Sequence, residues 1–243
     1  MTLTSRVITP FVRFVLGNIC RVDAREMARL PAKGPLIIVT NHINFLEVPL
    51  LYAFTYPRNI IGLVKKETWN NPFLGSLATA WEAVPIDRNA SDIGALKASL
   101  DVLAARGILA IAPEGTRSGD GRLGRGHAGV VQLAVRSGAT LVPVVHFGGE
   151  AFWGNLKKLR RTRVTFRVGE PFRIEAPEGG FTKTSRTEAS DELMRRIARL
   201  LPPRYRGLYS ENLDRPERYL VDINAGRDRT AHAPASTVSM ECV

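Results

Sequence analysis

Short apolar runs alternate along this chain with longer segments in which apolar residues recur every three or four positions. Five of the runs have the length and composition of buried strands: 36–39, 60–64, 84–86, 108–112 and 141–147. A sixth strand is predicted at 163–168, where valine and phenylalanine alternate with arginine and threonine. That alternation indicates one buried face and one polar face.

Helical periodicity separates most of these runs. Helices are predicted at 69–81, at 128–137, and between an N-cap at Ser91 and a terminating Gly107. A last amphipathic helix carries Leu193, Ile197 and Leu200 and ends before two prolines. Alternating strands and helices predict an α/β fold with a mixed, largely parallel sheet flanked by helices.

The pattern divides the chain into three parts. Residues 1–30 form an amphipathic N-terminal segment, residues 31–205 the α/β domain, and residues 206–243 a C-terminal extension. From about residue 226 the extension is small, polar and aperiodic, so we expect it to be disordered.

The N-terminal segment is apolar at 7–19 but is interrupted by Pro10 and Arg13. This run is too short to span a bilayer and lacks the cleavage pattern of a signal peptide. Four of its apolar residues fall near helical spacing: Phe11, Phe14, Val15 and Ile19. The stripe is typical either of a helix lying in a membrane interface or of one packed on the domain.

The charge balance is strongly basic. The 243 residues include 34 Lys and Arg against 23 Asp and Glu, a net charge of +11, with the densest basic run at 157–173. Such a run is a solvated face, or it binds nucleic acid, an anionic membrane or a phosphorylated substrate. Two cysteines, Cys20 and Cys242, cannot form a disulfide framework or a structural zinc site, which favours a reducing compartment.

Several reaction classes lack their motifs. The sequence contains no GxSxG, HExxH or GxxxxGK[ST] pattern. A GxGxxG match at 124–129 follows a polar loop rather than a strand, so nucleotide binding is not expected there. His127 and His146 are interpreted as a loop side chain and a strand-end residue.

Two loops that follow predicted strands carry candidate chemistry. In the first, His42 and Glu47 can meet if His42 lies in the turn and Glu47 in the first turn of a helix. The carboxylate would then accept from one ring nitrogen and leave the other as a base. The second loop, 113–118, combines glycine, hydroxyls and Arg117, which suit an anionic group.

Together these loops resemble the lysophospholipid acyltransferase family. The corresponding stretches are NHINFLE at 41–47, VPIDR at 84–88, PEGTRS at 113–118 and LVPVV at 141–145. The resemblance covers about residues 30–150, so it implies that the part at 31–205 is an acyltransferase domain. One position departs from the pattern, because Glu47 stands where the family has aspartate.

The resemblance implies transfer of a fatty acyl group from acyl-CoA or acyl carrier protein to the hydroxyl of a lysophospholipid such as 1-acylglycerol 3-phosphate. His42 would be the general base and Glu47 its orienting carboxylate. The phosphate would be bound by Arg88, Gly115, Thr116 and Arg117, with Glu114 shaping this substrate-binding loop. The scheme needs no metal and no cofactor, the acyl thioester being a substrate.

The resemblance and the basic charge together predict peripheral binding to anionic membrane lipids on the cytoplasmic face of the inner membrane, with no nucleic acid partner. Other acceptors stay open, namely glycerol 3-phosphate, another lysolipid or a lipid amine. The alternative from a different class is a basic protein that binds anionic lipid or nucleic acid without catalysis. That alternative explains the charge but leaves the two loop motifs as coincidence.

Overall fold

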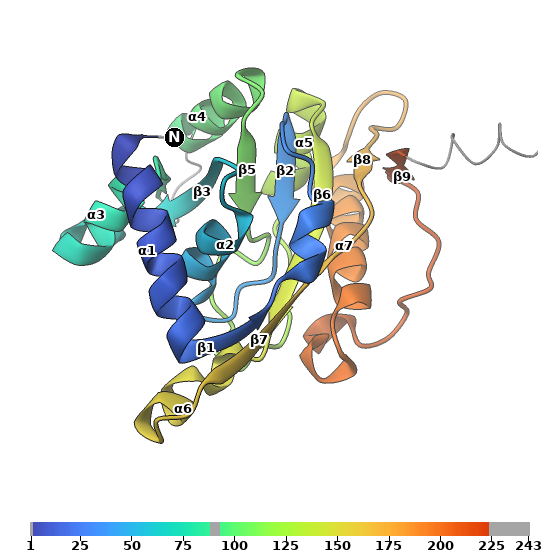
Figure 1. Cartoon of the computed structure of the whole chain (residues 1–243). Coiled ribbons are helices and arrows are strands. Elements are labelled where there is room, and N and C mark those ends of the chain that lie inside the picture. Colours follow the sequence, from blue (N-terminus) through green and yellow to red (C-terminus); the bar gives the residue numbers. More distant parts are fainter. Residues whose placement is uncertain (1, 88–92, 224–243) are drawn as a thin grey trace, which may run out of the picture.

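The structure is a computed structural model that describes residues 2–87 and 93–223. In this part of the chain a mixed sheet runs through the molecule with helices on both faces (Figure 1). Its strands are β1 (Cys20–Asp23), β2 (Leu36–Val39), β3 (Ile60–Lys65), β4 (Val84–Ile86), β5 (Ile108–Ile111), β6 (Thr140–Phe147), β7 (Thr162–Val168), β8 (Phe172–Ile174) and β9 (Leu220–Asp222). The α/β class predicted from the sequence is confirmed.

Most neighbouring strands are parallel. The order across the sheet is β1-β7-β6-β2-β5-β3-β4, and β8 pairs with both β6 and β9. The pairs β1·β7, β2·β5, β2·β6, β3·β4 and β3·β5 are parallel, whereas β6·β7, β6·β8 and β8·β9 are antiparallel. The sheet is therefore mixed and largely parallel, as the alternating pattern predicted.

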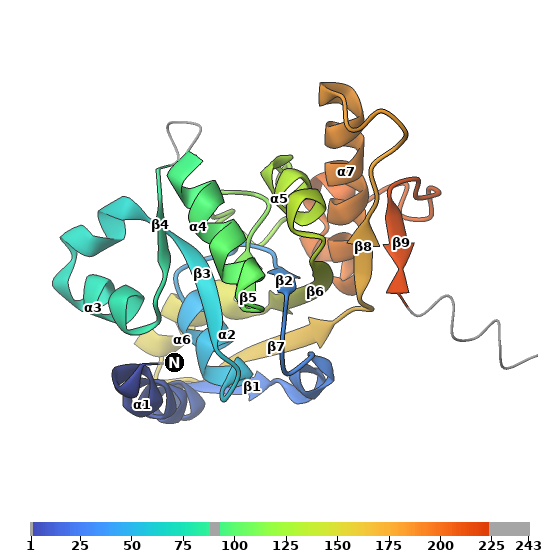
Figure 2. The same ribbon diagram turned by 90° about the horizontal axis from the view of Figure 1, so that it is seen from above.

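Helices cover both faces of this sheet. They are α1 (Leu3–Ile19), α2 (Glu47–Thr55), α3 (Pro72–Ala80), α4 (Ile93–Ala104), α5 (Gly129–Ser137), α6 (Phe152–Lys157) and α7 (Lys183–Leu200). Short 3-10 helices lie at η1 (Arg25–Arg29), η2 (Lys66–Asn70), η3 (Gly149–Ala151), η4 (Pro203–Tyr205) and η5 (Gly207–Tyr209). Figure 2 shows α4, α5 and α7 on one face and α1 and α2 on the other.

Strand β2 is buried on both faces, which explains why its apolar run has no polar positions. Ile37 and Val39 pack into the core under α5 and α7, while Leu36 and Ile38 pack into the core with α2. Successive side chains of a strand point to opposite faces, so a strand covered on both sides needs apolar residues throughout. The sheet thus divides one apolar interior into two layers.

The parallel register brings the ends of β2 and β5 together at one edge of the sheet, beside β6. Val39 of β2 lies opposite Ile111 of β5 and Pro143 of β6. The loops after β2 and β5 therefore leave the sheet side by side. Strand β6 continues for four further residues past this point and runs alongside both loops. Function is expected at this edge in open α/β sheets.

The two flanking parts of the chain each add strands to the sheet. Strand β1 of the N-terminal part pairs with β7, and β9 of the C-terminal extension pairs with β8. The three-part division drawn from the sequence stays a prediction. The predicted N-cap Ser91, the candidate residue Arg88 and the tail from about residue 226 lie outside the described residues.

Helix α1 packs on the domain through a narrow, partly polar face. Its buried residues are Ser5, Thr9 and Leu16. Its larger apolar side chains face outward and are exposed: Leu3, Val7, Phe11 and Phe14. In the part of the chain that the structure describes, no helix combines the length and apolar character needed to cross a membrane.

Candidate active site

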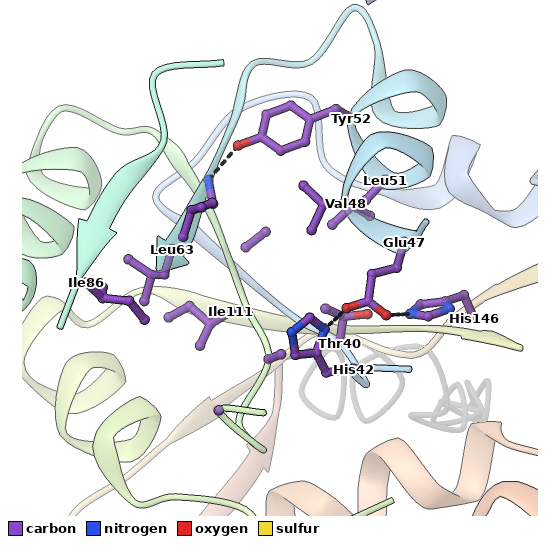
Figure 3. A pocket seen from close by; sticks show the side chains of 15 residues that line it. Thr40, His42, Glu47, Val48, Leu51, Tyr52, Leu63, Ile86, Ile111 and His146 are labelled. Carbon is purple, nitrogen blue, oxygen red and sulfur yellow. Dashed lines mark hydrogen bonds and ion pairs between the residues drawn. The ribbon is translucent and has the colours of Figure 1, made fainter. Parts of the chain in front are cut away.

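The turn between β2 and α2 carries the two residues predicted to form a catalytic pair. Residues 40–46 are not helical, and Glu47 is the first residue of α2. This change of direction lets the two side chains meet, which a straight helix would not allow. Nδ1 of His42 contacts Oε1 of Glu47, and both side chains are buried (Figure 3).

The other oxygen of the Glu47 carboxylate binds the turn itself. Oε2 accepts the backbone N–H groups of Ile43 at 2.7 Å and of Asn44 at 3.3 Å. The carboxylate also lies in the first turn of α2, where the helix dipole favours negative charge. An ionised Glu47 facing Nδ1 of His42 keeps the imidazole proton on that nitrogen. Nε2 then carries the lone pair that a general base uses.

His146 in β6 is a third member of this cluster. Its Nε2 lies 3.2 Å from Oε2 of Glu47 and 3.0 Å from the carbonyl oxygen of Asn41. Both neighbours are acceptors, so Nε2 of His146 carries a proton and donates. Burial lowers the pKa of His146 to about 4, which keeps the ring neutral near pH 7.

The sequence interpretation of His146 as a strand-end residue missed this contact. A signal was present, because His146 interrupts an otherwise apolar run in a buried strand. Asn41 joins the first loop to β6: its side-chain amide donates to the His146 carbonyl at 2.9 Å, and its Oδ1 accepts from the His146 N–H at 3.0 Å. The position of His146 beside Glu47 is therefore set by backbone hydrogen bonds.

Glu114 holds the second loop against the first. Its Oε1 accepts the backbone N–H of His42 and its Oε2 that of Gly124, each at 2.7 Å. Burial raises the pKa of this carboxyl, and the two amide hydrogen bonds act in the opposite direction. These contacts show Glu114 shaping the loop, and its assignment to substrate binding stays a prediction.

The remaining candidates of the second loop are Gly115, Thr116 and Arg117. Gly115 has a φ of +65° and lines the cavity beside His42, and a side chain there would meet the ring of His127 at 3.1 Å. Thr116 and Arg117 are exposed. The next residues bind the first loop, since Ser118 donates to the carbonyl of His42 at 2.8 Å.

Two cavities adjoin the cluster. One of about 100 Å³ is lined by His42, Glu47 and His146 together with apolar residues of β3 and β5. The other, of about 350 Å³, is an apolar groove between α1, α2 and α3 with Arg117 among its lining residues. Val48, Tyr52 and Val64 line both, so the groove lies directly beside the histidine cavity.

The segment 69–81, predicted to be helical, contributes to this groove. The lining residues from it are Phe73, Leu74, Leu77, Ala78 and Trp81. Trp81 stacks on Tyr52 with ring centroids 4.4 Å apart, which gives the groove a flat aromatic wall. Among the described residues, no cluster of three or more His, Cys, Asp or Glu could hold a metal ion.

Several known proteins have sequences related to this chain. A 1-acyl-sn-glycerol-3-phosphate acyltransferase of Limnanthes alba is 34% identical over 154 residues, which are 62% of this chain and 53% of that protein. The enzyme of the same name from Bacillus subtilis is 29% identical over 151 residues, 62% of this chain and 73% of that protein. The chain thus spans about half the length of the Limnanthes relative.

A solved structure has a similar fold. The 1-acyl-sn-glycerophosphate (LPA) acyltransferase PlsC from Thermotoga maritima superposes with a TM-score of 0.58 at 21% identity, covering 78% of this chain and 76% of that one. The sequence model of the family described as Acyltransferase matches residues 21–146, which hold both loops and the whole histidine and glutamate cluster. By this match over more than half of its length, the chain belongs to the acyltransferase family.

Proposed function

We propose that this protein transfers a fatty acyl group from a thioester of coenzyme A or acyl carrier protein to the free hydroxyl of 1-acylglycerol 3-phosphate, giving phosphatidic acid. One observation carries the proposal: the His42 and Glu47 pair lines a cavity that adjoins an apolar groove. A base beside an apolar channel suits a reaction between a hydroxyl and a long acyl chain. The names of the relatives support the same acceptor.

The chemistry follows from the tautomer of His42. Nε2 accepts the proton of the acceptor hydroxyl as its oxygen attacks the thioester carbonyl carbon. The new C–O bond forms, the C–S bond breaks, and the imidazolium returns the proton to the leaving thiolate. Glu47 stabilises the imidazolium while it exists. A thioester is already activated, so the residues need not form a covalent acyl-enzyme.

Binding of the substrates divides between polar and apolar surfaces. The acyl chain would occupy the groove lined by Phe73, Leu77 and Trp81. The phosphate would bind to Arg117, with Thr116, the backbone of Gly115 and Arg88 assisting. Arg117 suits this role because it lines the groove near the cavity and its guanidinium can bind a phosphate through two parallel donors.

A lipid acceptor requires contact with a membrane, and α1 offers one. Leu3, Val7, Phe11 and Phe14 form one exposed apolar stripe, and Phe11 also lines the groove. Large apolar side chains that face solvent along a helix favour a position in a bilayer interface. The basic excess favours anionic headgroups, so we place the protein peripherally on the cytoplasmic face of the inner membrane.

The test is release of thiol from palmitoyl-CoA, with and without lysophosphatidic acid, followed by mass spectrometry of the lipid products. A parallel reaction with acyl carrier protein as donor decides between the two thioesters. A panel of glycerol 3-phosphate, other lysolipids and lipid amines decides the acceptor. Absence of acyl transfer to every acceptor from both donors would instead favour a basic protein that binds anionic surfaces without catalysis.

A further inference from the structure

Helix α6 and the turn that follows it place three apolar side chains in solvent. Trp153 is 58% exposed, Leu156 is 37% exposed and Leu159 is 95% exposed. Exposed apolar residues scattered singly are normal on a protein surface, whereas three within seven residues form a patch. The exposed parts of these side chains are therefore available to a partner outside the described chain.

Leu159 adds a second observation. Its φ is +51°, the left-handed conformation, and its N–H donates to the carbonyl of Leu156 while that of Arg160 donates to Asn155. Glycine or asparagine is favoured at such a position after a helix, because a larger side chain strains the backbone. The leucine side chain is also almost fully exposed. Neither the backbone conformation of the turn nor packing in the core therefore explains why a leucine is found at this position.

The segment that carries this patch has charges of one sign. Between Glu150 and Glu170 the sequence has six basic residues and no acidic one. All six are exposed: Lys157, Lys158, Arg160, Arg161, Arg163 and Arg167. Apolar side chains set among lysines and arginines are typical of a surface that enters the headgroup region of an anionic bilayer.

The patch lies beside the apolar groove and the end of α1. Trp153 stacks on Phe45 with centroids 5.2 Å apart, and Phe45 lines the groove together with Phe11 of α1. The guanidinium of Arg161 donates to the carbonyl of Cys20 at 2.8 Å, directly after α1. Figure 1 shows α6 below the C-terminal end of α1, so the two helices lie at the same end of the molecule.

We propose that residues 152–161 are a second membrane contact, which docks on an anionic lipid bilayer. Trp153, Leu156 and Leu159 enter the interface, and Lys157, Lys158 and Arg160 bind headgroup phosphates. The proposal rests on the proposed function for its lipid partner. It adds that the protein is held at two places, on either side of the groove, so that the groove opens toward the acyl chains.

The first test is Leu159→Asn, measured by cosedimentation with vesicles of phosphatidylglycerol and phosphatidylcholine. Asparagine suits the left-handed backbone, so the melting temperature should stay the same or rise. Vesicle affinity should fall by roughly fivefold, because an apolar side chain is lost from the interface. The matched control is Leu208→Asn in η5, where the leucine is 70% exposed and lies outside the segment 152–161. Equal affinities of both variants and the wild type would overturn the proposal.

The second test reverses charge with Lys157→Glu and Lys158→Glu together. Affinity for phosphatidylglycerol vesicles should fall at least about tenfold at low salt, and the difference should vanish with pure phosphatidylcholine. The control is the pair Arg173→Glu and Lys183→Glu, which are exposed at β8 and at the start of α7. Equal losses in the control pair would show a general charge effect and overturn the proposal.

These readouts do not depend on catalysis. If the protein transfers no acyl group but both α6 variants lose vesicle binding, the proposed function fails and the second contact stands. If both variants bind vesicles like the wild type but lose turnover with acyl carrier protein as donor, the patch binds an acidic protein. That result would overturn the membrane contact and leave the proposed function intact.

Discussion

Nε2 of His146 lies 3.2 Å from Oε2 of Glu47, while the other oxygen of the same carboxylate contacts Nδ1 of His42. Glutamate is one methylene longer than the aspartate of the family pattern, so its carboxylate needs other contacts to hold its position. His146 and the backbone amides of Ile43 and Asn44 supply them on the oxygen that faces away from His42. The longer side chain is thus oriented by its own turn and by one tertiary contact from β6.

This relationship predicts that His146 positions Glu47. His146→Leu should lower kcat by roughly ten- to a hundredfold, as expected for loss of a polar contact with a charged group, with little change in KM. His146→Gln should restore much of the activity because its amide can still donate. Steady-state kinetics with palmitoyl-CoA measures both. Equal activity of the Leu and Gln variants, or a change confined to KM, would contradict the positioning role.

The base itself is tested by His42→Ala. The rate of acyl transfer should fall about 10² to 10⁴-fold, as expected for loss of a general base. The melting temperature should change little, because the hydrogen bonds of His42 to Glu114 and Ser118 use its backbone. Full activity in this variant would remove His42 from the mechanism. A large fall in melting temperature would point instead to a structural role.

The buried ring of His146 predicts a pH dependence of stability. Its pKa is lowered from 6.5 to about 4, so between these values the unfolded chain binds a proton that the folded chain does not. The free energy of unfolding should therefore fall as the pH drops through this window. Thermal melts from about pH 7.5 to 4.5 measure it.

The variant His146→Gln provides the comparison, since it lacks the titrating group. Its melting temperature should decline less steeply over the same range. The raised pKa of Glu114 acts in the opposite direction, because it favours the folded state on acidification, but both proteins retain it. Parallel curves for the two proteins would show that His146 titrates normally.

Recognition of the acceptor phosphate is tested at Arg117. Arg117→Lys keeps the charge but loses the two parallel donors, so KM for 1-acylglycerol 3-phosphate should rise by roughly tenfold. A monoacylglycerol acceptor, which lacks the phosphate, should show little difference. Arg122→Lys is the matched control, an exposed arginine of the same loop that pairs with Asp120. An equal effect on both acceptors would refute the assignment.

Membrane binding through α1 can be tested with substitutions at exposed positions, which leave the fold intact. Deletion of residues 1–20 would remove Cys20 from β1 and the hydrogen bond from Trp81 to Thr9, so binding and folding would change together. Val7→Ser with Phe14→Ser avoids this, because both side chains are exposed and neither lines the groove. Binding to phosphatidylglycerol vesicles should fall at least about tenfold, and high salt should release part of the remainder. Unchanged vesicle binding would mean that the exposed stripe of α1 contacts another partner and not the membrane.

Local pattern was enough to predict the central sheet. Strands such as β2 and β5 are continuous apolar runs because they are buried on both faces, and a helix follows or precedes each. The strands β1, β8 and β9 were not predicted. Each has only three or four residues and includes a charged one, so it shows neither a continuous apolar run nor a period. Their pairing depends on β7, β6 and β8 rather than on their own composition.

The pairing of His42 with Glu47 could also be inferred from the sequence, because both residues lie within one turn whose geometry follows from where the strand ends and the helix begins. The contact with His146 could not. It joins β6 to α2 through the register of the sheet, and a strand's partner is a long-range choice that local pattern does not specify.

The orientation of α1 also depended partly on the sequence and partly on the tertiary structure. The sequence determined that its apolar residues form a stripe, but a stripe packs equally well on a domain or in a bilayer interface. The tertiary structure decided between the two faces: small residues, Ser5 and Thr9, fit closely against the domain, and Thr9 accepts a hydrogen bond from Trp81. Phe11 and Phe14 stay exposed because the domain surface has room for only a narrow face of the helix. That surface is built by many residues that are distant in the sequence, so its shape could not be inferred from the helix alone.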